Sequence, residues 1–549
     1  MTSRKTLPEI EWLATEWGLP EEAFESVQKW MEAELGGSTA FPLGKPVSNW
    51  GKAAAPAGQA SDAPLVLVSH NQKTFLQSRL LFETEQEIAR RILELAKGES
   101  PCPDLEKQLT AIFPGAKPGD KQVAAARTAA SRNLTLITGG PGTGKTYTLA
   151  RILALLAGED MPAGVIRLAA PSGKAADRMK SAIAQSLERL PDSYHKKLDL
   201  LRRIAESSST IHSLLGYRPD TGRCRFGRDN PLPCSVLILD ECSMVDVHLW
   251  HALLEALPSG TRLILLGDPN QLTSVGQGNV FGEMARAASI SSSPLHCAHV
   301  HLTEARRFKD RPDILAFARA LENADAEKAT DLLEKSQSLE ATNGLAWIGG
   351  GGGSLSCDSF PQPILSALER VAAAETPAAA LAALGQVCIL TAQREYFVGA
   401  MAMSQQIENF FQLKKDTRNH PVIINRNDPE TGLRNGSVGV IHSASDGKRK
   451  AYFPAGDGSL KDFPLSKLPD YSAAWAITIH RSQGSEYEDV LVILPREESP
   501  MATRELLYTA ITRAKHNVYV AGDLESVKKA ALTPSNRTTL LGWALACGQ

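Results

Sequence analysis

A glycine-rich turn that ends in a lysine and a threonine lies within residues 134–156, which read LTLITGGPGTGKTYTLARILALL. The turn fits the pattern G-x-x-x-x-G-K-[ST], whose backbone N–H groups surround a polyphosphate at the positive end of a helix. Lys145 is expected to contact the β and γ phosphates, and the hydroxyl of Thr146 to bind Mg²⁺. Because an apolar strand precedes the turn and a helical pattern follows it, a chance match is disfavoured. The stretch therefore predicts a site for ATP and Mg²⁺.

An acidic pair follows a second apolar strand, in the sequence VLILDECSM at 236–244. The consecutive apolar residues predict a buried strand of a parallel sheet, whose carboxyl end presents Asp240 and Glu241. Asp240 can hold Mg²⁺ through water, and Glu241 can polarise the water that attacks the γ-phosphate. Such pairs are common on protein surfaces, but the apolar strand and the upstream phosphate loop favour the catalytic interpretation.

Two further polar groups follow later apolar segments. The sequence RLILLGDPNQ at 262–271 places Gln271 on the loop after a strand, where its amide can sense the γ-phosphate or its water. The segment HLTEARRFKD supplies Arg306 and Arg307, one of which could reach the γ-phosphate as an arginine finger. The alternative for these arginines is a solvated basic turn. Strands that end in acids and amides beside one phosphate loop predict an α/β ATPase core.

Three other polar positions are weaker signals on their own. Gln122 lies upstream of the phosphate loop, where an amide could pair with the adenine edge. The segment VIRLAAPSGKAADRM ends a strand with Ser172 and Lys174, which suit contact with a sugar-phosphate backbone. An ordinary strand-to-helix cap explains this segment equally well. Polar residues 223–233 could form a hairpin that projects from the same domain.

Length and composition limit the class of protein. The 549 residues are too many for one hydrophobic core and predict roughly three or four domains. With 59 Lys and Arg against 61 Asp and Glu, the net charge is −2, so any nucleic-acid surface must be a local groove. The 8 cysteines include no C-x-x-C pair, which predicts reduced thiols and no zinc site. Neither an apolar signal segment nor a membrane-spanning run occurs, so we expect a cytoplasmic protein.

Residues 1–110 are expected to form a separate N-terminal domain of mainly helical character. Apolar residues at helical spacing occur near its start, a strand is predicted at 64–68, and a long helix is predicted from Phe75 to Lys97. The domain contains no phosphate-binding or metal-binding pattern. Its early tryptophans either dock a partner protein or fill the core of the domain, with equal weight for both: Trp12, Trp17 and Trp30.

Two α/β motor domains are expected to make up the rest of the chain. The first is predicted over 111–320, with an insert at about 216–234, and the second over 321–549. Short strands and turns predict a small β-barrel inserted in the second domain at about 428–470.

The motifs along residues 120–522 resemble, in order, the motif set of superfamily-one DNA helicases: GGPGTGKT, APSGKAA, TIHSLLG, LDECSM, GDPNQLTSVG, LTEARRF, TIHRSQGSE and LLYTAITRAK. The last two are highly specific to this superfamily. Within it, the chain resembles the RecD family, the alpha subunit of exodeoxyribonuclease V. No helix-hairpin-helix repeats of the longer, stand-alone RecD-like helicases are recognisable. The resemblance implies two RecA-like P-loop motor domains and an SH3-like fold for the β-barrel insert.

The resemblance also implies a role for each motif residue. The nucleotide would be bound by Gln122, Gly139, Gly140, Gly142, Thr143, Gly144, Lys145, Thr146 and, near the ribose, Glu486. The catalytic set would comprise Lys145, Asp240, Glu241, Gln271, Arg307 and Arg513, with Mg²⁺ held by Thr146 and Asp240. Single-stranded DNA would be held, without sequence readout, by Ser172, Lys174, His212, Thr478, His480 and Ser482.

The function implied by the resemblance is ATP-dependent 5′→3′ translocation on single-stranded DNA and unwinding of duplex ends, beside RecB-like and RecC-like subunits, in double-strand-break repair and recombination. Ser172, Cys242 and Arg481 stand where the family usually has Thr, Ala and Lys, which are mild changes. A recognisable cluster of nuclease carboxylates is lacking, so DNA cleavage is expected of a partner subunit. A stand-alone helicase and an ATP-binding structural subunit without unwinding activity are the alternatives.

Overall fold

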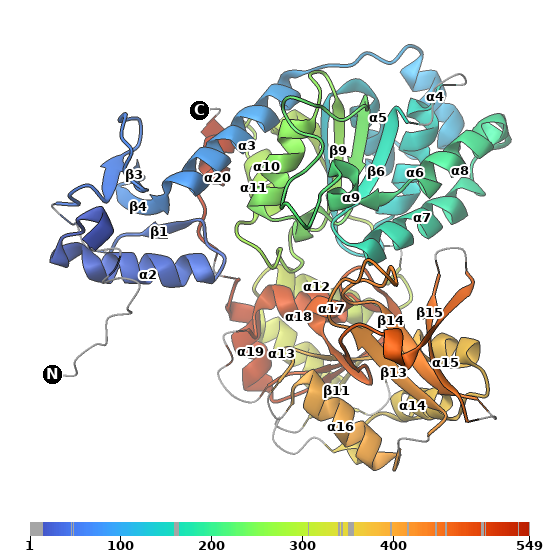
Figure 1. Ribbon diagram of the computed structural model, residues 1–549. Helices are drawn as coiled ribbons and strands as arrows, with labels where there is room; N and C mark the ends of the chain where they lie inside the picture. Colours follow the sequence, from blue (N-terminus) through green and yellow to red (C-terminus); the bar gives the residue numbers. More distant parts are fainter. Residues whose placement is uncertain are drawn as a thin grey trace.

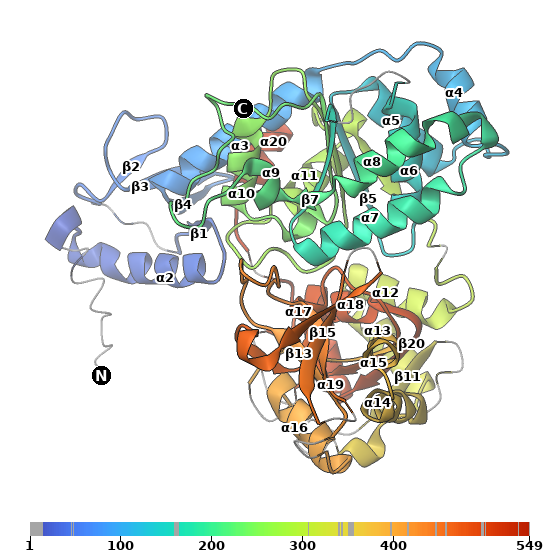
Figure 2. The same cartoon turned by 45° about the vertical axis from the view of Figure 1, so that its right-hand side comes forward.

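The computed structural model describes residues 12, 15–44, 47, 49–158, 164–305, 307–338, 341, 344–349, 356–395, 398–413, 417–444, 447–455, 458–495, 499, 501–535 and 537–547. Arg306, one of the two arginines considered above, lies outside these residues. Figures 1 and 2 show two α/β units stacked on each other, with a smaller unit at one side that contains the first strands. In the described part of the chain, no helix is long and apolar enough to cross a membrane.

The N-terminal unit is a mixed α/β fold, so the predicted helical domain is wrong. Its sheet has the strand order β1-β4-β3-β2 and lies beside α2 (Phe24–Leu35): β1 (Ala40–Pro42), β2 (Ala54–Pro56), β3 (Leu65–His70) and β4 (Lys73–Ser78). Strands β3 and β4 form a hairpin, with Asn71 and Gln72 at positive φ angles of 47° and 61° in the turn. The helix predicted from Phe75 therefore begins only at Arg79, after β4.

The tryptophans of this unit differ in their exposure. Trp30 is buried in a core with Val27 and Leu65, and Trp17 packs against that core. The side chain of Trp12 is 62% exposed. Core filling is therefore correct for Trp17 and Trp30, while Trp12 is available to a partner.

The first motor unit is built on a parallel sheet with the strand order β10-β5-β9-β8-β6-β7. Its strands are β5 (Leu134–Gly139), β6 (Ile166–Ala170), β7 (Ser209–Thr210), β8 (Val236–Leu239), β9 (Arg262–Gly267) and β10 (His299–Leu302). Its helices are α3 (Arg79–Lys97), α4 (Leu105–Ile112), α5 (Lys121–Ser131), α6 (Lys145–Leu156), α7 (Gly173–Leu187), α8 (Leu198–Glu206), α9 (Ile211–Leu215), α10 (Val247–Ala256) and α11 (Val280–Ser289). Successive residues of β9 alternate between two hydrophobic clusters, with Leu263 in one and Ile264 in the other. The sheet is thus buried on both faces, as its fully apolar strands predicted.

The second motor unit has a parallel sheet with the strand order β11-β20-β19-β12-β18. Its strands are β11 (Leu345–Gly349), β12 (Val387–Thr391), β18 (Ala476–Thr478), β19 (Tyr487–Ile493) and β20 (Ala514–Ala521). Its helices are α12 (Pro312–Glu322), α13 (Ala326–Lys335), α14 (Gln362–Ala373), α15 (Pro377–Leu384), α16 (Ala400–Phe410), α17 (Ile479–Ser482), α18 (Arg504–Ile511) and α19 (Leu524–Leu532). Val490 and Leu491 of β19 again belong to different clusters. Two parallel α/β sheets confirm the predicted α/β class.

The unit boundaries differ from those predicted at 110 and 320. Ile88 of α3 lies in the core of the first motor unit, so the N-terminal unit ends near β4. Phe317 of α12 lies in the core of the second unit, so the first unit ends before α12. An amphipathic pattern shows which helix face is buried but does not show which sheet buries it.

A five-stranded antiparallel sheet is inserted in the second motor unit, with the order β16-β15-β14-β13-β17. Its strands are β13 (Asn419–Ile424), β14 (Val438–Ser443), β15 (Arg449–Pro454), β16 (Leu460–Pro464) and β17 (Tyr471–Ala473). The insert thus begins near 419 and not near 428. The polar segment 216–234 contains two short antiparallel bridges, Arg218 with Arg223 and Gly227 with Asn230.

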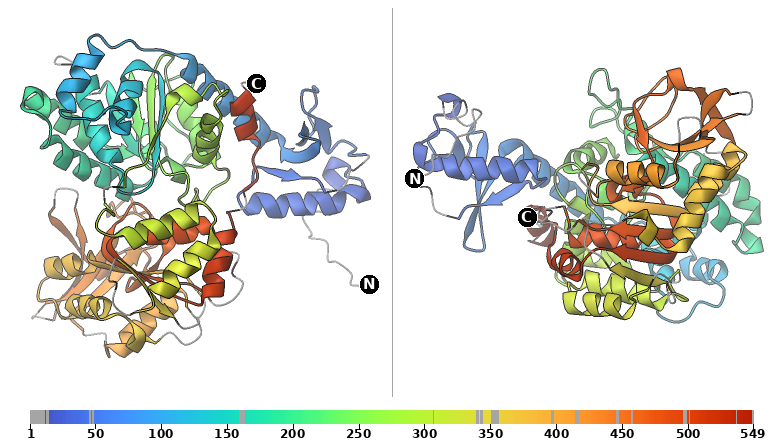
Figure 3. Two further views of the ribbon diagram at one scale, coloured as in Figure 1. Left: turned by 180° about the vertical axis from the view of Figure 1, so that it is seen from behind. Right: turned by 90° about the horizontal axis from the view of Figure 1, so that it is seen from below.

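The C-terminal segment leaves the second motor unit and returns to the other two units (Figure 3). The backbone N–H groups of Thr39 and Ala40 donate to the carbonyl of Thr538 at 2.9 and 3.1 Å. Helix α20 (Leu541–Cys547) then joins the core of the first motor unit. The predicted second motor domain, 321–549, therefore ends before this helix.

Candidate functional site: a cleft between the two motor units

A cleft between the two motor units collects most of the residues that the motifs singled out. It is lined by Pro141, Gly142, Gly144, Lys145, Thr146, Tyr147, Ala175, Arg178, Met179, Ala182, Asp240, Glu241, Gln271, Arg307, Glu486 and Arg513. The loops after β5, β8 and β9 meet here, because the carboxyl ends of parallel strands lie at one edge of a sheet. Glu486 and Arg513 come from the second unit. One cleft thus combines groups that lie far apart in the sequence.

The phosphate loop joins β5 to α6, as predicted. Gly144 precedes α6 with a φ angle of 86°, a conformation that favours glycine. The Nζ atom of Lys145 donates hydrogen bonds to the carbonyls of Gly139 at 2.6 Å and Gly140 at 3.1 Å. The ammonium group therefore lies against the loop, at the wall of the cleft.

Gln122, which was expected at the adenine, contacts the phosphate loop. Its side chain is buried, and its Nε2 donates to the carbonyl of Thr143 at 3.2 Å. Asp120 caps α5, since its Oδ1 accepts from the backbone N–H of Gln122 at 2.7 Å. The amide thus supports the loop in this structure, and its contact with adenine stays a prediction.

Asp240 and Glu241 follow β8 and line the cleft. The backbone N–H of Glu241 donates to Oδ1 of Asp240 at 2.8 Å, and Glu241 has a positive φ angle of 54°. Such a conformation is unfavourable for a residue with a Cβ and is found at functional sites. Burial and the negative charge of Glu241 raise the pKa of Asp240 to about 6.

These residues fit a Mg²⁺ ion that arrives with the nucleotide. Thr146 and Asp240 both line the cleft, and a divalent cation would favour the ionised form of the buried Asp240. Mg²⁺ usually takes one or two protein oxygens and completes its shell with water and substrate phosphates. Among the described residues, no group of three or more His, Cys, Asp or Glu could hold a metal ion.

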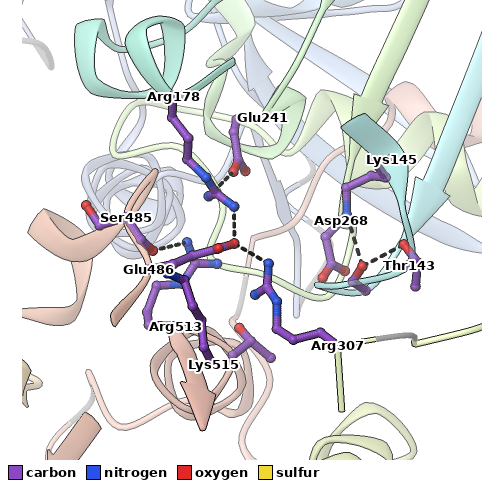
Figure 4. A network of polar contacts seen from close by, with 12 residues as sticks. Thr143, Lys145, Arg178, Glu241, Asp268, Arg307, Ser485, Glu486, Arg513 and Lys515 are labelled. Atoms are coloured by element: carbon purple, nitrogen blue, oxygen red, sulfur yellow. Dashed lines mark hydrogen bonds and ion pairs between the residues drawn. The ribbon is translucent and has the colours of Figure 1, made fainter. Parts of the chain in front are cut away.

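Glu486 lies between two arginines (Figure 4). Its Oε1 accepts hydrogen bonds from Arg307, at 2.5 Å, and from Arg178. Burial alone would raise the pKa of Glu486, but the charges of Arg178 and Arg307 outweigh burial and lower it. The carboxylate therefore stays ionised and holds Arg307 at the cleft. The ribose contact expected of Glu486 stays a prediction.

Arg307 packs against the phosphate loop as well as Glu486. A Cβ placed on Gly142, whose φ angle is +75°, would lie 2.3 Å from the Cβ of Arg307. Only glycine therefore fits at this position. The predicted arginine finger thus lies beside the loop that would hold the phosphates.

Arg178 is a cleft residue that the sequence analysis missed. Its Nη1 lies 3.7 Å from Oε1 of Glu241, and its Nη2 contacts Glu486. One guanidinium group thus bridges carboxylates from both motor units. A signal was available, since Arg178 lies one helical turn after Lys174 in the motif APSGKAADRM.

Gln271 and Arg513 meet across the cleft. Nη2 of Arg513 donates to Oε1 of Gln271 at 2.8 Å, and Nε2 of Gln271 donates to Oδ2 of Asp268 at 3.2 Å. Arg513 is buried and also donates to the carbonyls of Thr509 at 3.2 Å and Ser485 at 3.4 Å. The two expected γ-phosphate contacts thus form one hydrogen-bonded pair that joins the units.

The residues expected at DNA differ in accessibility. His212 is exposed, and Thr478 and His480 are partly exposed at the start of α17. The side chain of Ser482 is 0% exposed, and its hydroxyl donates to the carbonyl of Ile479 at 2.7 Å. In this structure α17 turns the Ser482 side chain inward, and the contact of Ser482 with DNA stays a prediction.

Ser172 and Lys174 lie at the start of α7. The hydroxyl of Ser172 accepts from the backbone N–H of Ala175 at 3.3 Å, which is the helix cap considered as the alternative. Lys174 is partly buried and lines a second cavity with Cys388 and Arg434. Burial lowers the pKa of Lys174 to about 8. Contacts of these two residues with DNA stay predictions.

Two family models and several known proteins match this chain. Residues 122–277 match the family described as an AAA domain, and residues 473–521 match the UvrD-like helicase C-terminal domain. The RecBCD enzyme subunit RecD of Mycolicibacterium smegmatis is 35% identical, over 83% of this chain and 79% of that protein. The RecBCD enzyme subunit RecD of Mycobacterium tuberculosis is 32% identical, over 91% of this chain and 84% of that protein.

More distant similarities include a second kind of helicase. The ATP-dependent RecD2 DNA helicase of Deinococcus radiodurans is 28% identical, over 73% of this chain and 48% of that protein. A crystal structure of Pif1 helicase from Candida albicans aligns with 75% of this chain and 96% of that chain, at 18% identity and a TM-score of 0.40. The proteins that match at 35% and 32% identity are all RecD subunits, and the matches cover most of each chain. This chain therefore belongs to the RecD family.

Proposed function

We propose that this chain is a 5′→3′ translocase and helicase on single-stranded DNA, and the RecD-like subunit of a RecBCD-type helicase and nuclease complex. It would act on DNA ends in double-strand-break repair and recombination. The broader class follows from the family and its helicase domains, since the chain is an ATP-dependent DNA helicase of superfamily one.

The convergence of both motor units on one cleft carries this proposal. Lys145 and Glu241 come from the first unit, while Arg513 comes from the second. Gln271 and Arg513 already share a hydrogen bond of 2.8 Å across the cleft. A nucleotide bound between these groups would contact both units and would therefore favour one relative orientation of the two units over others. This arrangement supports ATP-driven opening and closing.

The cleft residues would divide the work of phosphoryl transfer. Lys145 would bind the β and γ phosphates, and Glu241 would orient and deprotonate the attacking water. Arg307 and Arg513 would stabilise the charge that develops on the γ-phosphate. When bound through Thr146 and Asp240, Mg²⁺ would neutralise phosphate charge. Gln122 would contact the adenine, and Glu486 the ribose.

Movement along DNA would follow from closure of two RecA-like domains around ATP. Ser172 and His212 on the first unit, and Thr478 and His480 on the second, would hold the DNA backbone in turn. The antiparallel sheet of residues 419–473 would form an SH3-like barrel beside the single-stranded DNA.

The N-terminal unit would dock the RecB-like and RecC-like subunits. Large apolar side chains are exposed on it or next to it: Trp12 at 62%, Leu35 at 88% and Leu80 at 67%. Large exposed apolar side chains are enriched at protein interfaces. DNA cleavage would then be the task of a partner subunit.

Duplexes with a single-stranded tail at one end test the direction of movement. We expect the purified chain to unwind a duplex with a 5′ tail and to leave a duplex with a 3′ tail intact. Lys145→Ala is the control for ATP dependence. Unwinding only from the 3′ tail would overturn the direction but not the helicase class. A lack of DNA-stimulated ATP hydrolysis would favour the structural-subunit alternative.

Co-expression with the RecB-like and RecC-like subunits of the same host tests the complex. We expect the subunits to co-elute, and the double variant Leu35→Asp and Leu80→Asp to weaken co-elution without loss of ATPase activity. Leu460→Asp is the matched control, since Leu460 is an exposed leucine on β16 of the insert. Full co-elution of the double variant would place the interface elsewhere. A wild-type chain that never co-elutes would favour a stand-alone helicase.

A further inference from the structure

The loop after β9, residues 268–272, is held by the second motor unit at several points. This loop carries Gln271, the expected sensor of the γ-phosphate. The contacts are Tyr508 with Asp268 at 3.0 Å, Thr509 with Leu272 at 2.8 Å, and Arg513 with Gln271 at 2.8 Å. Tyr508 and Thr509 lie on α18, and Arg513 follows this helix. One helix end of the second unit therefore holds the sensing loop of the first.

Tyr508 also reaches a third element. Its hydroxyl oxygen lies 2.9 Å from Oε1 of Glu322 on α12, in addition to its contact with Asp268, and its side chain is 2% exposed. A Cβ placed on Gly140 of the phosphate loop would lie 3.1 Å from the same hydroxyl. This hydroxyl is therefore at the point where the phosphate loop, the sensing loop and α12 meet.

The contacts of Tyr508 require one additional proton. A phenol hydroxyl has one hydrogen and can donate to only one of the two carboxyl groups. The other carboxyl group can share the same hydroxyl only if it is protonated and donates to it. Both Asp268 and Glu322 are in surroundings that favour the protonated form, because burial raises the pKa of each.

Few charges face this group of three side chains. Lys145 on the phosphate loop and His301 on β10 act on Asp268, and Arg319 on α12 acts on Glu322. The positive charge of Lys145 favours ionised Asp268, which makes Glu322 the better holder of the proton. The hydroxyl of Tyr508 then donates to Asp268 and accepts from Glu322.

We propose that Tyr508 is a positioning residue that joins the two motor units through one proton shared with Asp268 and Glu322. It acts on the sensor through Asp268, because Nε2 of Gln271 donates to the same Oδ2 atom at 3.2 Å. Closure of the cleft is thereby transmitted to the orientation of Gln271. The inference rests on the proposed ATP-driven cycle and adds the residue that couples its sensor to the second unit.

Tyr508→Phe tests this role because it removes only the hydroxyl. We expect the DNA-stimulated kcat of ATP hydrolysis to fall about tenfold and the KM for ATP to change less than about twofold. We also expect more ATP to be consumed per nucleotide travelled, a ratio that a loss of folded protein leaves unchanged. Tyr194→Phe is the matched control, since the Tyr194 hydroxyl donates to the carbonyl of Gln108 at 3.3 Å on another part of the first unit. Unchanged kcat and unchanged ATP consumption per nucleotide in Tyr508→Phe would overturn the proposal.

Glu322→Gln tests the shared proton. In the wild type, raising the pH removes this proton, so turnover should fall on the alkaline side. The amide of the variant donates to Tyr508 without a titrating proton, so the variant should keep its turnover and lose the alkaline fall. An alkaline fall of the same size in the variant would overturn the shared proton. If the wild type itself lacks DNA-stimulated ATPase activity, the proposed function fails, and this result is seen before any variant is compared.

Discussion

Two carboxylates, the largely buried Glu486 in the cleft and the buried Glu85 near the C-terminal segment, have opposite surroundings. Glu486 pairs with Arg178 and Arg307, whose charges outweigh burial and lower its pKa. In the contacts described, Glu85 accepts hydrogen bonds only from neutral donors, and burial raises the pKa of Glu85. Its side-chain donors are Thr39 at 2.6 Å, Thr539 at 2.6 Å and Gln77 at 2.9 Å, and the backbone of Leu540 also donates. The carboxylate between arginines is therefore held in its ionised form, whereas the carboxylate among neutral donors is in surroundings that favour its protonated form.

The donors to Glu85 show what its junction does. Thr39 and Gln77 belong to the N-terminal unit, Thr539 belongs to the C-terminal segment, and Glu85 itself lies on α3. The junction therefore ties three parts of the chain together by hydrogen bonds. The cleft also joins distant segments, but it uses opposite charges that a ligand with phosphates can compete for. This difference separates a functional site from a structural contact.

Lys145→Ala should have the largest effect on the cleft. Loss of the lysine's positive charge, which would bind the β and γ phosphates, should lower ATP turnover by about a thousandfold or more. The fold should persist, because the Lys145 hydrogen bonds go to carbonyls of its own loop. ATPase assays with and without oligo-dT measure the loss, and the Tm checks the fold. Substantial turnover in this variant would contradict the assignment of the cleft as the ATPase site.

Glu241→Gln should separate binding from hydrolysis. The amide keeps the size of the side chain but cannot accept a proton from water, so hydrolysis should fall by about 100-fold or more. Binding of a fluorescent ATP analogue should remain, because the phosphate loop is unchanged. A variant that hydrolyses ATP at the wild-type rate would assign the water-activating role to another residue.

Glu486→Gln and Glu85→Gln compare the two carboxylates directly. Removing the charge of Glu486 leaves Arg178 and Arg307 without their shared partner, so we expect kcat to fall about tenfold. Glu85→Gln should leave kcat within about twofold and lower the free energy of unfolding by about 1 kcal/mol. Urea unfolding and ATPase assays measure both variants. Equal effects of the two substitutions on kcat would contradict the distinction between cleft and junction.

A pH-dependent effect on stability, with no effect on the chemistry of the cleft, is expected of Glu283 on α11, beside Gly542 of the C-terminal helix. Burial raises the pKa of Glu283 to about 7, despite the nearby charge of Arg286. Because this value is above that of the unfolded chain, the group stabilises the fold fully at acid pH and loses this effect as the pH rises through about 7. Glu283→Gln should therefore gain stability relative to the wild type by on the order of 1 to 3 kcal/mol between pH 5 and pH 8.

Urea unfolding of both proteins at the two pH values measures this gain. Glu255→Gln, on α10, is the control, since the Glu255 carboxylate is more exposed than that of Glu283. A stability difference that does not change with pH would show that Glu283 titrates normally in the folded state.

Local patterns predicted the parts of the fold that depend on neighbouring residues. The strand, turn and helix around Lys145 were correct, because the order of apolar run, glycines and helical period defines that unit. The prediction of a helical N-terminal unit was wrong, because the strands of this unit are short. In the strand Lys73–Ser78, KTFLQS, apolar and polar residues alternate only weakly before α3. The predicted start of the insert, at about 428, lies after β13, because the sequence of β13 resembles that of an ordinary buried strand of the motor unit.

The sequence by itself determined the chemistry of the cleft, namely which strand ends carry the phosphate loop, the acidic pair and the sensing amide. These features depend on residues that are adjacent in the chain. Only the tertiary structure decided that Arg178 and Arg307 share Glu486, at separations of 308 and 179 residues. It also decided that Tyr508 bridges Asp268 and Glu322 and that the C-terminal helix returns to α3. Such contacts form only when separate hydrophobic cores have packed together, and no local pattern contains that information.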